Sequence, residues 1–357
     1  MKHLELFSGI GGFRQAIDLL GIDFGKAFKC IGFSEIDLYA IKTYKSNFNT
    51  TDELELGDIE SFASNKSNII GLPNFDLLSG GFPCQSFSMM GKQRGFKDSR
   101  GNSFYRIIDI LKIKKPEFVL LENVKNLINH DEGNTLRTII STLKNTGYKN
   151  IYYDVFNTSN FSLAQTRNRV FIFASRGKLP TSFSFSQNSV SESFKNIKGK
   201  TSILHQNSVL DLLEKKVDDK YYLSQKIKKT ILSDGTKSFV SKSEINKLIA
   251  RPLTATMVKM HRACQDNYYS DDFINSKNPE KYLKKIFSKE ELYSQPIRKL
   301  TPVEALALQG FNSVFFNKAS AAGVSNHQLY KQAGNAVSVN TVYAILHHLL
   351  IENKLHK

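Results

Sequence analysis

A cysteine in a short loop that contains a proline is the residue of this sequence best suited to nucleophilic chemistry. Cys84 follows Pro83, shortly after an apolar run at Leu77–Ser79 that predicts a strand. Ligands and reacting groups of α/β proteins usually lie in the loops at the carboxyl edge of the sheet. Nearby positive charge stabilises a thiolate, and four basic residues follow: Lys92, Arg94, Lys97 and Arg100. We therefore predict that Cys84 is a nucleophile, whereas Cys30 and Cys264 are interpreted as inert thiols.

A carboxylate and two arginines border other predicted strands. Glu122 directly follows the apolar run Phe118–Leu121, so its carboxyl group and the reactive thiol could meet over one substrate. Arg167 and Arg169 precede the strand predicted at Val170–Ala174, and in an extended backbone they would point the same way. Their guanidinium groups suit a carbonyl, a carboxylate or a phosphate. Ordinary surface ion pairing is the alternative interpretation of both arginines.

A glycine-rich turn near the start indicates a ligand that approaches bare backbone. The strand predicted at Leu4–Phe7 runs into Ser8-Gly9-Ile10-Gly11-Gly12. Arg14 stands where the dinucleotide fingerprint requires a third glycine, which disfavours a pyrophosphate cofactor. Glu35 and Asp58 follow the next two expected strands, where a carboxylate can accept hydrogen bonds from ribose hydroxyls. Together these features predict an adenosine-containing ligand, although the glycines alone would also fit a purely structural turn.

The elements that must position these residues alternate between strands and helices up to about residue 178. This order predicts an α/β fold with a doubly wound, mostly parallel sheet. Strands are expected at Leu4–Phe7, Ile31–Ser34, Leu77–Ser79, Phe118–Leu121, Ile151–Phe156 and Val170–Ala174, and helices at Gly12–Leu20, Leu38–Asn47, Ser103–Ile113 and Thr135–Asn145.

The composition changes after Pro180 to a Ser-, Asn- and Lys-rich stretch that is typical of a linker. We therefore expect a catalytic domain at 1–178, a second, smaller domain at 180–295 and a return segment at 296–357 that completes the first domain. Residues 180–295 carry 20 Lys and Arg against 13 Asp and Glu, and are more basic per residue than the rest. Helices are expected in the return segment at Pro302–Gln309 and at about Val337–Leu350.

Charge and cysteine content narrow the function classes. The 357 residues include 49 Lys+Arg and 33 Asp+Glu, which gives a net charge of +16 and a pI near 9.5. This charge favours nucleic acid as the partner; the alternative is a basic protein whose charge only keeps it soluble. Three scattered cysteines predict neither a disulfide framework nor a zinc site, so no metal is expected. No apolar run reaches the roughly 18 residues of a membrane span, and no signal peptide is recognisable, so we expect a cytoplasmic protein. A monomer is the default expectation.

Six ordered motifs resemble those of the DNA (cytosine-5) methyltransferase family, in its bacterial and phage restriction-modification form. The resemblance covers nearly the whole chain except about 180–295. The motifs are Phe7–Gly12, Pro83-Cys84-Gln85, Glu122-Asn123-Val124, Gln165–Arg169, Arg298–Pro302 with Leu308–Phe311, and Gln332–Val337.

The resemblance implies a Rossmann-like domain that binds S-adenosyl-L-methionine and releases S-adenosyl-L-homocysteine. Phe7 would contact the adenine, Glu35 the ribose and Asp58 the adenine amino group. Asn335 would close the pocket. Ile36 stands where the family often has a tryptophan. The full set of implied cofactor-binding residues is Phe7, Gly9, Gly11, Gly12, Glu35, Ile36, Asp58, Pro83 and Asn335.

The same resemblance implies a covalent mechanism on a cytosine flipped out of duplex DNA. Cys84 would add to C6 while Glu122 hydrogen-bonds N3 and the exocyclic amine, and Arg169 with Arg167 beside it would hold the O2 side. The base that removes the C5 proton is not identifiable. The basic loop 91–101 would close over DNA, and residues 180–295 would recognise the target. Candidate DNA-binding residues are Ser88, Lys92, Arg94, Arg100, Arg251, Thr254 and Thr256.

These observations predict a DNA (cytosine-5-)-methyltransferase that produces 5-methylcytosine in a specific duplex sequence, and that protects DNA from a cognate restriction endonuclease. Two other functions share the motifs: tRNA methylation and DNA binding by a regulator on an inactive methyltransferase scaffold. Arg14 and the cysteine loop disfavour a nicotinamide-dependent enzyme.

Overall fold

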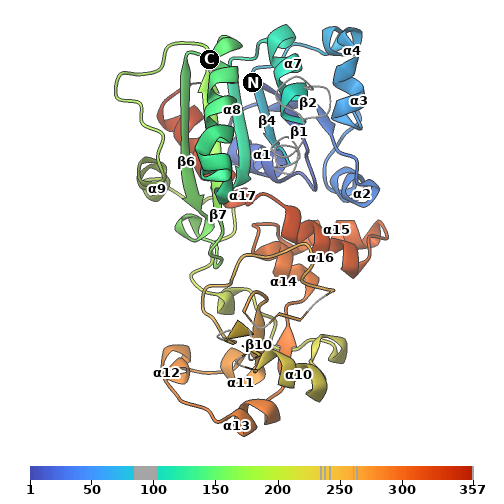
Figure 1. The fold of residues 1–357 in the computed structure, drawn as a ribbon, viewed down its shortest axis with the longest axis vertical. Helices are drawn as coiled ribbons and strands as arrows, with labels where there is room; N and C mark the ends of the chain where they lie inside the picture. The colour runs from blue at the N-terminus through green and yellow to red at the C-terminus, as the bar shows by residue number, and fades with distance from the viewer. Residues whose placement is uncertain are drawn as a thin grey trace. The chain divides into compact units, whose positions relative to one another are not determined.

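The computed structural model describes residues 1–83, 103–233, 235–236, 239–240, 243–259, 261–262 and 264–355 (Figure 1). Two compact units make up the chain. Unit 1 contains Met1–Phe161, Asn168–Ile203 and Val337–Lys357, and unit 2 contains Ser162–Arg167 and Leu204–Ala336.

A seven-stranded sheet in the order β3-β2-β1-β4-β5-β7-β6 forms the centre of unit 1. The pairings among β1 to β5 are parallel, and β7 runs antiparallel to both β5 and β6. The strands are β1 (Lys2–Leu6), β2 (Lys29–Ser34), β3 (Leu54–Glu55), β4 (Leu77–Gly81), β5 (Phe118–Val124), β6 (Asn150–Asn157) and β7 (Asn168–Ser175).

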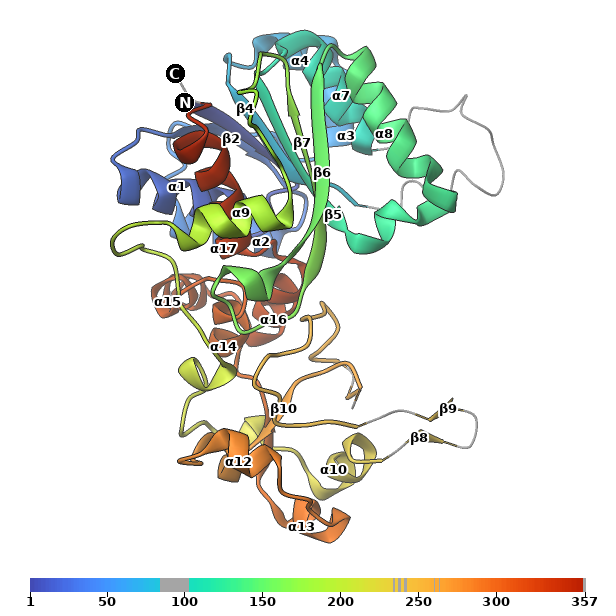
Figure 2. The ribbon, with the colours of Figure 1, turned by 90° about the vertical axis from the view of Figure 1, so that its left-hand side faces the viewer.

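Helices cover both faces of this sheet, which gives the predicted doubly wound α/β fold. Figure 2 shows α1 (Gly12–Phe24), α9 (Gln187–Lys195) and α17 (Val339–Leu346) on one side, with α3 (Ile59–Ser64), α4 (Lys66–Gly71), α7 (Ser103–Lys114) and α8 (Asn134–Asn145) on the other. Helix α2 (Leu38–Asn47) follows β2, and a π-helical turn at His347–Glu352 continues α17.

Apolar residues of the central strands form one core with α3, α4, α7 and α8. Each of these strands and helices contributes side chains that are almost fully buried, for example Leu6, Leu78, Leu121, Ile108 and Ile139. Strands buried on both faces need such continuous apolar runs, which is why the sequence predicted them.

The unit boundaries differ from the expected domain boundaries at three places. Ser162–Arg167, expected in the catalytic domain, belong to unit 2. The stretch expected as a linker continues into α9, because Ser186 and Ser189 form a capping box and the helix buries Val190. Residues 296–336, expected in the catalytic domain, belong to unit 2, because β11 (Ile297–Lys299) pairs with β10 (Tyr268–Ser270). The return to unit 1 begins at Val337.

Unit 2 combines short helices with two small antiparallel sheets. Its core includes Leu223, Ile231 and Tyr268, and a fully buried Arg298–Glu304 ion pair reinforces the start of α14. The remaining elements are α10 (Gln225–Ile231), β8 (Gly235–Thr236), β9 (Phe239–Val240), α11 (Asp271–Ile274), α12 (Pro279–Leu283), α13 (Lys289–Ser294), α14 (Pro302–Ala307), α15 (Ser313–Ala321) and α16 (Asn326–Asn335). Short 3₁₀ turns occur at Lys125–Ile128, His130–Gly133, Thr158–Phe161, Val209–Asp211 and Asp219–Tyr221. Within the described ranges, no helix is both long and apolar enough to cross a membrane.

Candidate active site

An ion pair between Glu122 and Arg169 joins β5 to β7. The two strands are antiparallel neighbours, with Val124 opposite Arg169, so the Glu122 and Arg169 side chains reach each other at one end of the pair. Arg169 Nε lies 2.9 Å from Glu122 Oε1, and the side chains are only 22% and 13% exposed. The partly buried guanidinium fixes the orientation of the carboxylate.

Gly81 leaves room for this carboxylate. A Cβ at Gly81 would lie 3.0 Å from Glu122 Oε2, closer than most carbon contacts. Gly81 is also opposite Glu122 in the pairing of β4 with β5. The glycine at the end of β4 therefore lets the acid on β5 lie against the backbone that enters the cysteine loop.

Asn123 holds that backbone in place. Its Nδ2 donates a 2.8 Å hydrogen bond to the carbonyl of Phe82, and the amide group is buried. Phe82 itself is buried and packs against Phe104, with ring centroids 5.7 Å apart. The segment leading to Pro83 is thus attached to β5 by a buried polar contact and to α7 by an aromatic one.

Five of the predicted site residues lie outside the part of the chain that the structure describes. They are Cys84, Ser88, Lys92, Arg94 and Arg100. Pro83 is the last described residue before this segment and is exposed.

The glycine turn divides into an open part and a packed part. Gly9, with φ of +55°, has no heavy atom within 4 Å of the position of a Cβ. At Gly11, by contrast, a Cβ would lie 2.4 Å from the Phe48 ring, and at Gly12 it would lie 2.4 Å from Val337 Cγ1. Gly9 therefore offers open backbone to a ligand, whereas Gly11 and Gly12 are required for close packing.

Glu35, which directly follows β2, is hydrogen-bonded to the glycine turn. Its Oε2 accepts a 2.7 Å hydrogen bond from the amide of Gly9, and its Oε1 accepts from the amides of Ile36 and Asp37 at 2.8 and 2.9 Å. The next side chain, Ile36, is 71% exposed. A fixed acid, open backbone and an exposed apolar side chain suit a ligand that has both hydroxyl groups and a flat ring.

The other two adenosine-related candidates also lie in unit 1. Phe7 is half-buried, with a left-handed φ of +53°, at the end of β1. Asp58 is exposed and caps α3, accepting hydrogen bonds from the Glu60 amide at 3.0 Å and the Ser61 hydroxyl at 2.9 Å. Its observed contacts are those of a helix cap.

Glu5, a buried acid in β1, was not among the predicted site residues. Glu5 of β1 is fully buried, and burial raises the pKa of its carboxyl group to about 8, although Arg14 acts in the opposite direction. Arg14 itself pairs with Asp18 and with Glu53. The only sequence signal was an acidic residue within an apolar strand, which in a buried sheet indicates a neutral or paired group.

Arg167 and Arg169 have different partners in the structure. It falls in unit 2, is only 2% exposed, and donates to the Leu253 carbonyl at 3.0 Å and to the Gly334 and Ala336 carbonyls at 3.1 Å. The observed contacts of Arg167 are therefore structural, and they join the segment around Leu253 to the end of α16.

Two further motif residues support the same segment. Gln165 Nε2 donates to the Leu308 carbonyl at 2.8 Å, and its Oε1 accepts from the Leu253 amide at 2.9 Å. A Cβ at Gly334 would lie 2.3 Å from the backbone of Thr254 and Ala255. Asn335, predicted to bind cofactor, is the last residue of α16 in this unit.

The predicted DNA-binding residues of unit 2 are already hydrogen-bonded within the unit. Arg251 donates to the Glu244 carbonyl at 2.9 Å and lies 3.5 Å from the Glu244 carboxylate. The hydroxyls of Thr254 and Thr256 both accept hydrogen bonds from Arg262.

This chain is similar in sequence and fold to known proteins. The profile of the family described as C-5 cytosine-specific DNA methylase matches residues 1–350. The type II methyltransferase M1.ScrFI of Lactococcus lactis subsp. cremoris is 37% identical over 353 residues, covering 98% of this chain and 78% of the relative. The orphan methyltransferase M.SPRI of Bacillus phage SPR is 28% identical over 442 residues, covering 98% and 97%. Among solved structures, the Entamoeba histolytica methyltransferase EhMeth has the same fold, with a TM-score of 0.73 at 20% identity over 100% of this chain and 99% of that one.

Proposed function

The chain belongs to the C-5 cytosine-specific DNA methylase family, a family of DNA cytosine-C5 methyltransferases, and on this premise we propose how its residues act. Cys84 adds to C6 of a cytosine flipped out of a specific duplex sequence, and the methyl group is transferred to C5. The observation that carries this proposal is the Glu122–Arg169 pair at the end of β5, next to the backbone that leads into Cys84.

Covalent addition overcomes the low nucleophilicity of cytosine C5. The Cys84 thiolate forms a bond to C6, and electron density moves into the ring, so that C5 becomes an enamine carbon. In its protonated form, Glu122 donates a hydrogen bond to N3, while its other oxygen accepts one from the exocyclic amine. The proton moves to N3 as charge develops on the ring and returns to Glu122 when the Cys84–C6 bond breaks. After methylation, a base removes the C5 proton, the Cys84–C6 bond breaks, and the thiolate is regenerated.

Arg169 is proposed to act while it is paired with Glu122. Its Nε orients the Glu122 carboxylate. The rest of its guanidinium would hold the O2 side of the base. Arg167 is assigned a positioning role, because it is buried and donates hydrogen bonds to three backbone carbonyls.

The family implies S-adenosyl-L-methionine as the cofactor, and the glycine turn fits it. S-adenosyl-L-methionine supplies an electrophilic methyl group and is released as S-adenosyl-L-homocysteine. Gly9 would present open backbone to it, and Glu35 would bind the ribose. Phe7 and Ile36 would contact the adenine, with Asp58 at its amino group. Gly11 and Gly12 are assigned to packing and not to direct contacts with the cofactor, because a Cβ at either position would meet Phe48 or Val337.

Double-stranded DNA is the proposed substrate, and unit 2 is proposed to read its sequence. A cytosine inside a duplex is inaccessible to attack at C6, so it must be extruded at a cost of a few kcal/mol. The net charge of +16 favours binding to the phosphate backbone. The relatives include type II methyltransferases as well as orphan ones, and we favour a role in protecting DNA from a cognate restriction endonuclease.

The test is bisulfite sequencing of DNA from a host that expresses the protein, beside a host that expresses Cys84→Ser. We expect 5-methylcytosine at one short sequence with the wild-type protein and none with the variant. Full methylation by Cys84→Ser would refute the covalent mechanism. Modification of tRNA in place of DNA in a competition assay would refute the substrate assignment.

A further inference from the structure

A cradle of oxygen acceptors surrounds Arg262 in unit 2. Arg262 Nη2 donates to Thr254 Oγ1 at 2.8 Å, to Thr256 Oγ1 at 3.1 Å and to Asp266 Oδ1 at 3.2 Å. Three acceptors on one nitrogen restrict the rotation of the guanidinium. The plane of this guanidinium is therefore set by the protein before any ligand binds.

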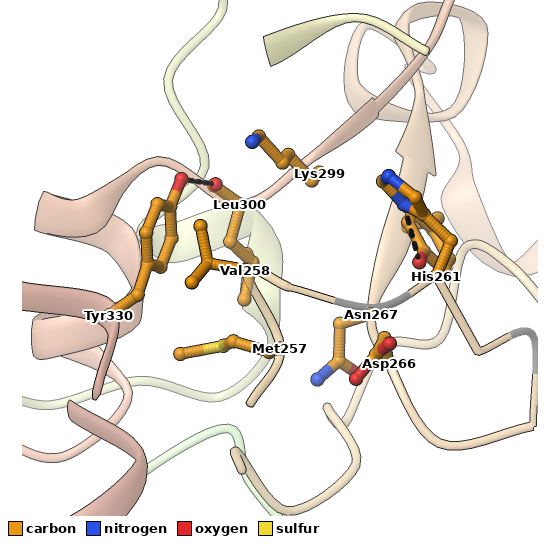
Figure 3. A pocket seen from close by; sticks show the side chains of 9 residues that line it. Met257, Val258, His261, Asp266, Asn267, Lys299, Leu300 and Tyr330 are labelled. Carbon is orange, nitrogen blue, oxygen red and sulfur yellow. Dashed lines mark hydrogen bonds between the residues drawn. The ribbon is translucent and has the colours of Figure 1, made fainter. Parts of the chain in front are cut away.

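The backbone of the same segment holds the cradle together. The Arg262 amide donates to Asp266 Oδ2 at 2.9 Å, and the Asp266 amide returns a 2.8 Å hydrogen bond to the Arg262 carbonyl. Asp266, Asn267 and Met257 are among the residues that line a small pocket of unit 2 (Figure 3). The Asp266 side chain is only 5% exposed, so it acts as a buried anchor for the arginine.

The third guanidinium nitrogen is left for an external partner. Among the described residues, Nη1 of Arg262 makes no recorded hydrogen bond, Nε is buried without a partner, and the side chain remains 24% exposed. Arg251 differs, because Glu244 engages both of its terminal nitrogens and its side chain is 13% exposed. Of these two arginines, Arg262 is the one with a free nitrogen on an oriented group.

We propose that Arg262 recognises a guanine in the target sequence, with Nη1 donating to the O6 and N7 acceptor edge in the major groove, and that Thr254 and Thr256 are positioning residues for it. Guanine is the base whose major-groove edge presents two adjacent acceptors, and arginine is its usual partner. This inference rests on the proposed methylation of duplex DNA.

The orientation of the side chain favours a base over a phosphate. Phosphate oxygens accept hydrogen bonds from many directions, and flexible lysines contact them well. Lys259 is an exposed residue of the same segment and has no recorded hydrogen bond from its side chain among the described residues. It therefore provides a matched basic control for the oriented Arg262.

The experiment uses the purified full-length protein, S-adenosyl-L-methionine and a random-sequence duplex library read by bisulfite sequencing. For Arg262→Ala we expect the preference for guanine at one position to fall by about tenfold or more, while preferences at the other positions persist. Arg262→Lys should lose the same preference although it keeps the charge. Lys259→Ala should lower methylation of all sequences alike and weaken the dependence on salt.

A modified base separates a base contact from a structural role. Replacing the guanine at that position by 7-deazaguanine removes the N7 acceptor. The wild-type protein should methylate this duplex more slowly than the guanine duplex, whereas Arg262→Ala should methylate both duplexes at the same rate. If Arg262→Ala fails to fold, the double variant Thr254→Val, Thr256→Val keeps the arginine and should reduce the same preference. An unchanged base preference in folded Arg262→Ala, or an equal 7-deazaguanine effect in both proteins, would overturn the inference. Absence of methylation by the wild-type protein would instead refute the proposed function.

Discussion

Gly334→Ala is the substitution whose effect the structure defines most closely. The new Cβ would lie 2.3 Å from the Ala255 amide nitrogen, 2.3 Å from the Thr254 carbonyl carbon and 2.5 Å from the Thr254 carbonyl oxygen. All three are backbone atoms, so no side chain can rotate away. Restoring an ordinary 3.4 Å contact requires the backbone at Thr254 and Ala255 to move by about 1 Å.

Overpacking of this kind costs about 1–3 kcal/mol, and for unit 2 that lowers the melting temperature by roughly 3 to 10 °C. The displaced backbone carries Thr254, which holds Arg262, so the target sequence preference should weaken together with stability. The assay is thermal melting of the full chain combined with bisulfite sequencing of a methylated random library.

Gly71→Ala is the matched control, because no heavy atom lies within 4 Å of the position of its Cβ and the residue is exposed at the end of α4. We expect its melting temperature to stay within a degree or two of wild type. The reasoning fails if Gly334→Ala melts at the wild-type temperature and keeps the wild-type sequence preference.

Three further predictions concern unit 1. Burial raises the folded-state pKa of Glu5 from 4.5 to about 8, so the contribution of Glu5 to stability is complete below pH 4.5 and is lost as the pH rises through 8. Burial also lowers the pKa of His3 to about 3, but this shift affects stability only below about pH 6.5. Melting temperature should therefore fall between pH 6.5 and 8.5 in the wild type and fall less in Glu5→Gln, and parallel pH profiles would contradict this. Asn123→Ala leaves the Phe82 carbonyl without its buried donor, which costs about 1–3 kcal/mol. We expect this variant to have a lower kcat and an unchanged Kd for S-adenosyl-L-methionine. An equal loss in kcat and in cofactor affinity would show a general defect. Glu122→Gln should lower kcat about 100-fold or more without weakening cofactor binding, measured by single-turnover kinetics and calorimetry, and a kcat near wild type would remove the acid from the mechanism.

The sequence predicts the central sheet well because its signals are local. Apolar runs ending in glycine, proline or a polar residue identify β1, β2, β4, β5, β6 and β7, and each lies within a few residues of its predicted position. The carboxyl-edge position of Glu122 follows from the same pattern. The helices α3, α4 and α9 were not predicted, because they are short and their apolar residues are few, so tertiary packing decides their structure.

Interactions between distant residues could not be predicted in this way. Arg167 looked like a partner of Arg169 by spacing, but its acceptors are 86, 167 and 169 positions away in the chain. Gly12 looked like a cofactor contact, and its nearest neighbour is Val337. The cradle of Arg262 likewise joins residues that are not neighbours in the chain, since Thr254 and Asp266 both accept hydrogen bonds from its Nη2.

A duplex that carries 5-fluorocytosine at the methylated position tests the central claim most directly. Fluorine replaces the C5 proton that must leave, so a protein that attacks C6 through Cys84 remains attached to the DNA after methyl transfer. With S-adenosyl-L-methionine and the correct sequence, we expect a denaturant-stable adduct that peptide mapping assigns to Cys84, and no adduct for Cys84→Ser. Normal methylation of the unmodified duplex without any trapped adduct on the fluorinated one would contradict the account.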